Sequence, residues 1–174
     1  MALSYAHPKR KFYEWLCGVA EEHYFTTSIF DPEAFDPVTT SKAEYVERDV
    51  YVPEPNTPRL QAILLHEVGH LVANSDMPTH ANTLEQEAEA WLWAIDQYAE
   101  PNSLIYQWGD EDQWDSEKNG REVMLWAINT YWWSKQIAQF PADASGKWCD
   151  LMNRLDAEYD PVFNKWVASE DLAF

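Results

Sequence analysis

The 174-residue chain has few cysteines and no apolar run long enough to span a membrane. Cys17 and Cys149 lie far apart and form no Cys-x-x-Cys pair, so neither a disulfide framework nor a thiolate zinc site is predicted. We expect both to be ordinary core or half-buried thiols. Residues 1–11 contain basic side chains but no apolar signal region after them, so we expect a soluble, cytoplasmic protein.

Basic residues are also scarce: 12 lysines and arginines stand against 30 aspartates and glutamates, a formal net charge of −18. Such a surface repels the phosphates of nucleic acids and anionic lipids, so direct binding to nucleic acid or to a membrane is not expected. The charge suits a basic protein or peptide as partner or substrate, and leaves open that the protein imitates nucleic acid. Acidity that simply keeps a tryptophan-rich protein soluble is the other interpretation.

The length and the 46% apolar content fit one sizeable core. We therefore expect a single domain over residues 1–174, with an α+β fold that is mostly helical and has a small β-sheet. Short strands are predicted within 44–52, and loops over 26–43 and over the acidic stretch 107–120. Apolar spacing and capping residues predict the helices, which span residues 8–25, 57–73, 83–98, 121–139 and 144–157, before an irregular tail.

The densest chemistry is the motif His66-Glu67-Val-Gly-His70. Residues four apart on a helix lie one turn above each other, so the two histidines can offer imidazole nitrogens to one ion. Glu67 then lies beside the metal, where its carboxylate can take a proton from a metal-bound water. The motif therefore predicts two ligands of a zinc site and a general base.

The helix that carries this motif is clearly marked, because Thr57 can cap it and Pro58 suits its first turn. Most of its other side chains are apolar, which predicts a buried helix. Two histidines and a glutamate are costly to bury unless something binds them. The motif is short enough to occur by chance, but this context favours a bound ion.

A catalytic zinc ion needs a third protein ligand and an open position for water. With the apolar stripe of residues 84–98 centred near Leu84 and Ile95, Glu87 lies roughly 60 to 70° from the buried centre, against about 90° for Glu85 and about 130° for Glu89. We therefore predict the ligand set His66, His70 and Glu87. The remaining candidates are Asp76, which a tight turn could return to the metal, and His80, which has no helical register with the histidines.

Two short segments resemble the ImmA/IrrE-type metallopeptidases. These are His-Glu-Val-Gly-His-Leu-Val (66–72) and Glu-Gln-Glu-Ala-Glu-Ala-Trp (85–91), beside the family pattern His-Glu-Leu-Gly-His followed by Glu-x-Glu-Ala-Asn-x-Phe-Ala. The resemblance implies a zincin-like, gluzincin-type domain in which His66, His70 and Glu87 hold zinc and Glu67 is the catalytic base. Glu89 stands where the family has Asn, and Trp91 where it has Phe.

The resemblance covers about residues 40–98, the motif-bearing core. The tryptophan-rich, helical C-terminal half, 121–160, has no counterpart that we can name. Members of the family typically act on helix-turn-helix repressors and often carry DNA-binding or sensor domains. Nothing in this chain looks like either, so no substrate is carried over.

These observations predict a zinc-dependent metallopeptidase that hydrolyses a peptide bond in a protein substrate, with metal-activated water and Glu67 as general base. A second oxyanion donor is expected, with Tyr98, Tyr106, Arg121 and Tyr131 as candidates.

The alternative is an acidic binding or inhibitor protein on the same scaffold, occupying a basic or nucleic-acid-binding partner. Its contact surface would draw on tryptophans that otherwise pack in the core. They are Trp108, Trp114, Trp126, Trp132, Trp133, Trp148 and Trp166.

Overall fold

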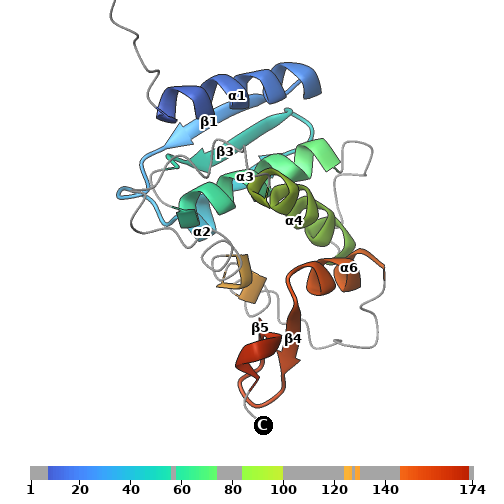
Figure 1. Ribbon diagram of the computed structural model, residues 1–174. Coiled ribbons are helices and arrows are strands. Elements are labelled where there is room, and N and C mark those ends of the chain that lie inside the picture. The colour runs from blue at the N-terminus through green and yellow to red at the C-terminus, as the bar shows by residue number, and fades with distance from the viewer. Residues whose placement is uncertain are drawn as a thin grey trace, which may run out of the picture.

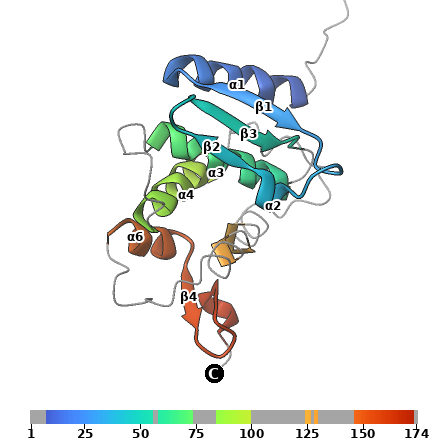
Figure 2. The same cartoon turned by 180° about the vertical axis from the view of Figure 1, so that it is seen from behind.

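The computed structural model describes residues 8–55, 58–73, 84–99, 124–126, 128–129 and 146–172. Helices and small sheets are mixed along the chain, which confirms the α+β class. Figures 1 and 2 show a helix and a three-stranded sheet at one end of the molecule and a short hairpin at the other. Within the described residues, none of the helices has the length and apolar character needed to cross a bilayer.

The larger sheet has the strand order β1-β3-β2, with β1 at Thr26–Phe30, β2 at Lys42–Glu44 and β3 at Asp49–Pro53. β1 runs parallel to β3, whereas β2 is antiparallel to β3 and joined to it by the turn 45–48. Helix α1 (Pro8–His23) lies alongside β1 (Figure 1). The Arg48 guanidinium donates hydrogen bonds to the carbonyls of His23 and Tyr24, which anchors the turn to the end of α1.

Helix α3 (Pro58–Ala73) packs against β3 and β2 on one side and against α4 (Leu84–Ala99) on another. Leu64, Leu65 and Val68 of α3 are fully buried in the core. The two helices approach so closely at Gly69 that an added Cβ would lie 2.5 Å from the carbonyl oxygen of Ala90. This close packing brings the polar side chains of α3 within reach of α4.

The C-terminal part begins with α6 (Lys147–Arg154), which packs on α4. Strands β4 (Ala157–Asp160) and β5 (Lys165–Ala168) then form an antiparallel hairpin, followed by the 3₁₀ turn η2 (Ser169–Asp171). Trp148 and Trp166 are buried here with their ring centroids 5.9 Å apart. These two tryptophans therefore belong to the core.

The structure confirms the helices predicted over 8–25, 57–73 and 83–98. The loop predicted over 26–43 is wrong, because β1, the short helix α2 (Pro37–Thr40) and β2 lie there. β1 forms by parallel pairing with β3, from Thr26 opposite Asp49 onwards, and this long-range contact leaves little trace in the local sequence.

The helix predicted over 144–157 ends at Arg154, and the tail expected to be irregular is the β4–β5 hairpin. Residues 146–172 are therefore less helical than expected. Residues 124–126 and 128–129 are helical, as predicted, but the rest of 121–139 and the stretch 107–120 lie outside the described residues.

The prediction of core or half-buried thiols is also wrong, because Cys17 and Cys149 are both exposed. Each cysteine follows a buried residue, Leu16 in α1 and Trp148 in α6. Consecutive helical residues point about 100° apart, which turns both thiols away from the core.

Candidate metal centre

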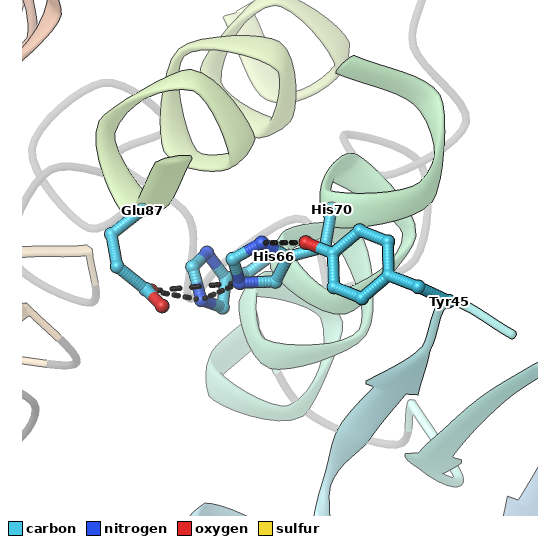
Figure 3. Close-up of polar contacts among 4 residues, drawn as sticks. All are labelled: Tyr45, His66, His70 and Glu87. Carbon is cyan, nitrogen blue, oxygen red and sulfur yellow. Dashed lines mark hydrogen bonds and ion pairs between the residues drawn. The ribbon is translucent and has the colours of Figure 1, made fainter. Parts of the chain in front are cut away.

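Three polar side chains from α3 and α4 converge on one another (Figure 3). His66 and His70 lie one turn apart on α3, with ring centroids 4.5 Å apart. Glu87, near the start of α4, points its carboxylate at both rings. All three side chains are buried where α3 packs against α4, so they face the interior and not solvent.

The three side-chain atoms that face one another are nearly equidistant. Glu87 Oε2 lies 3.0 Å from His66 Nε2 and 3.5 Å from His70 Nε2, and the two nitrogens are 3.2 Å apart. A tetrahedral zinc ion with bonds of about 2.0 to 2.1 Å separates its ligand atoms by about 3.3 Å. The triad could therefore hold a metal ion.

Burial of these groups also fits a cation. Glu87 is 2% exposed, His70 6% and His66 9%. Within the described part of the chain, Glu87 Oε2 and His66 Nδ1 have no hydrogen-bond partner of regular geometry. A buried carboxylate oxygen that contacts two nitrogens but makes no regular hydrogen bond is costly, and a cation between the three atoms would remove that cost.

The protonation of the triad reflects its packing. Burial raises the pKa of Glu87, but the two imidazoles outweigh burial and bring the pKa well below the ordinary value for a glutamate. Burial lowers the pKa of His70, but the contact with Glu87 and its charge outweigh burial and raise it above the ordinary value. Without an ion, Glu87 therefore stays ionised to a lower pH than an ordinary glutamate, and His70 stays protonated to a higher pH than an ordinary histidine.

Glu67 lies next to His66 and is partly buried. Burial raises the pKa of its carboxyl group, and the charge of Glu87 raises it further. His66, His70 and a backbone hydrogen bond from Ala43 act in the opposite direction without reversing the shift. A carboxylate with a raised pKa is a stronger base than an ordinary glutamate, and this one lies beside two histidines that could bind a metal ion.

Two aromatic residues contact the histidines, and neither was predicted as part of the site. The hydroxyl oxygen of Tyr45 lies 3.2 Å from His70 Nδ1, and the indole of Trp91 stacks on the ring of His66. In the sequence, Trp91 belongs to the apolar stripe of residues 84–98, which predicts a helix but no site residue. Tyr45 lay in a predicted strand, and nothing in the sequence linked it to a histidine 25 positions away.

The neighbouring glutamates of α4 lie elsewhere. Glu85 Oε2 accepts a hydrogen bond from the backbone nitrogen of Lys147, 3.0 Å away, at the start of α6. The Glu89 side chain is 24% exposed, with Oε1 3.9 Å from Lys147 Nζ. Asp76, His80, Tyr106, Arg121, Tyr131 and the side chain of Tyr98 lie outside the described residues.

Comparisons of the chain with family models, with curated proteins and with solved structures give no match.

Proposed function

We propose that the protein is a zinc-dependent metallopeptidase with a zincin-like domain related to the ImmA/IrrE type. His66, His70 and Glu87 would hold the metal. The observation that carries this proposal is the convergence of three buried ligand atoms, 3.0 to 3.5 Å apart, from two successive helices. The small sheet packed against the motif helix is consistent with such a domain.

The donor set favours zinc over harder cations. Two imidazole nitrogens and one carboxylate oxygen make a zinc ligand set that leaves a fourth position open, whereas magnesium and calcium prefer oxygen ligands. Bound zinc supplies a Lewis acid that makes water acidic and polarises a peptide carbonyl.

Glu67 would perform the proton transfers. Its carboxyl group interacts electrostatically with His66, His70 and Glu87, and its raised pKa suits a group that accepts a proton and then releases it. In this proposal, Glu67 accepts a proton from the attacking water and then donates that proton to the leaving amine. The substrate class is a protein or peptide, and the net charge of −18 favours basic segments. We also propose that the chain forms a single domain and that the protein acts in the cytoplasm.

The test compares zinc-loaded parent and Glu67→Gln protein, purified without a histidine tag, on a peptide library that includes basic sequences. Mass spectrometry identifies cleaved peptides, and metal analysis measures bound zinc. We expect Glu67→Gln to keep zinc and lose about 10²- to 10⁴-fold in cleavage rate, because general base catalysis is removed. Glu89→Gln makes the same chemical change at a partly exposed position outside the triad and should behave as the parent. Unchanged cleavage by Glu67→Gln would remove that residue from the mechanism.

An acidic binding protein on the same scaffold is the second candidate. The turn between β4 and β5 exposes 79% of Val162 and 64% of Phe163, an apolar pair on a strongly acidic protein. Such a pair suits contact with a protein partner. If binding is the function, Glu67→Gln keeps the biological effect, whereas Phe163→Ser weakens it.

A further inference from the structure

Tyr45 makes a polar contact with the second histidine of the triad. Its hydroxyl oxygen lies 3.2 Å from His70 Nδ1, on the side of the ring away from Glu87 (Figure 3). We propose that Tyr45 is a positioning residue that holds His70 in the tautomer with the proton on Nδ1 and the free lone pair on Nε2. The inference rests on the proposed metal site and concerns how the protein prepares it.

The tautomer decides whether His70 can be a ligand. A neutral imidazole carries its proton on one nitrogen and offers a lone pair on the other. His70 Nε2 is the atom that lies 3.2 Å from His66 Nε2 and 3.5 Å from Glu87 Oε2. If the proton stayed on Nε2, no lone pair would face the triad. A phenolic oxygen can accept the Nδ1 hydrogen bond and so favours the other tautomer.

His66 is held by a different kind of contact. Within the described residues its Nδ1 has no hydrogen-bond partner, and its ring lies against the indole of Trp91 with centroids 4.2 Å apart. The two ligands on α3 are thus oriented differently, His70 by a hydrogen bond and His66 by ring stacking. Loss of the Tyr45 hydroxyl should therefore act through His70.

The fold places Tyr45 where this role requires it. Tyr45 directly follows β2, at the first position of the turn that Arg48 anchors to the end of α1. β2 packs against α3, and the backbone of its residue Ala43 hydrogen-bonds to Glu67. The β2–β3 hairpin therefore makes two polar contacts with α3, one with Glu67, the proposed general base, and one with His70, a proposed ligand.

The experiment uses full-length protein without a tag, stripped of metal, and measures zinc affinity by competition with a chelator of known affinity. We expect Tyr45→Phe to bind zinc about 10- to 100-fold more weakly than the parent, as for other residues that orient ligands. Tyr159→Phe is the matched control, because it removes a hydroxyl that donates to Asn164 Oδ1 at 2.7 Å in the C-terminal hairpin. Its zinc affinity should equal that of the parent.

A spectroscopic readout separates positioning from a loss of stability. Nitrogen-15 NMR of the zinc-loaded parent should show His70 protonated at Nδ1 and coordinated through Nε2. Coordination through Nδ1, or equal zinc affinity in Tyr45→Phe and parent, would overturn the inference and leave the proposed metal site standing. A parent protein that binds no zinc would overturn the site as well. Should Tyr45→Phe fail to fold, judged by circular dichroism, the NMR result on the parent decides.

Discussion

The imidazole of His66 lies almost parallel to the indole of Trp91, with 4.2 Å between ring centroids and 20° between ring planes. Trp91 is 3% exposed and stands four residues after Glu87, one turn further along α4. One face of α4 therefore presents both a carboxylate and a flat aromatic surface to α3. The stack limits the rotation of a ring that has no hydrogen bond at Nδ1 among the described residues.

Replacing Trp91 with leucine should weaken both folding and metal binding. The change removes a large buried ring, which should lower the free energy of unfolding by roughly 2 to 4 kcal/mol. It also releases the His66 ring, so zinc affinity should fall. Trp166→Leu removes a buried tryptophan from the C-terminal hairpin and should cost similar stability at unchanged zinc affinity. Urea unfolding and chelator competition check both expectations, and equal zinc affinities in the two variants would contradict the role of the stack.

Gly69→Ala tests the close approach of α3 and α4. The new Cβ would lie 2.5 Å from the carbonyl oxygen of Ala90, a backbone atom that cannot move without shifting the helix. We expect a loss of about 1 to 3 kcal/mol in the free energy of unfolding, as for overpacked cores. Gly18→Ala is the control: nothing lies within 4 Å of the added Cβ in α1, so helix propensity should stabilise the protein by up to about 1 kcal/mol. Equal effects of both changes on thermal unfolding would refute the close contact.

The stability of the metal-free protein should depend on pH through the triad. The pKa of Glu87 is lowered in the folded state, so its contribution is present above 4.5 and is lost as the pH falls. The pKa of His70 is raised, so its contribution is present below 6.5 and is lost as the pH rises through the folded-state pKa. Both contributions are full between these values. The difference in unfolding free energy between parent and Glu87→Gln, measured with chelator present, should peak there and shrink above that window. A difference independent of pH would contradict the ion pair.

Zinc binding should release protons. A histidine with a raised pKa keeps its proton to a higher pH than an ordinary histidine, and a proton on Nε2 must leave before that nitrogen can bind zinc. Zinc affinity should therefore fall as the pH drops through the pKa of His70, by about tenfold per pH unit for each proton released. Titration calorimetry in two buffers of different ionisation enthalpy counts the protons. Identical heats in both buffers would mean that no proton is displaced.

The sequence predicts those features of the site that depend on a single helix. The spacing of His66 and His70, and the angle of Glu87 from the apolar stripe of α4, are properties of single helices, and α3 and α4 formed where their patterns indicated. The structure brings these three side chains together. It leaves the chemical roles assigned to them as predictions.

The contacts that escaped prediction are those between distant segments. β1 depends on parallel pairing with β3, and the Tyr45 hydrogen bond joins the turn after β2 to a histidine 25 residues away. Local periodicity contains no information about which strand pairs with which, or about where a turn directs its side chain. The exposed cysteines were mispredicted because a residue type gives only an average burial.

The central claim is tested most directly by zinc stoichiometry and affinity in protein purified without a histidine tag, comparing the parent with Glu87→Gln and Glu89→Gln. The two variants make the same change two residues apart on α4, one at a buried triad atom and one at a side chain that is about a quarter exposed. We expect one zinc ion per chain in the parent and in Glu89→Gln, and an affinity at least about tenfold weaker in Glu87→Gln. A parent without stoichiometric zinc, or a Glu87→Gln variant that binds zinc as tightly as the parent, would contradict it.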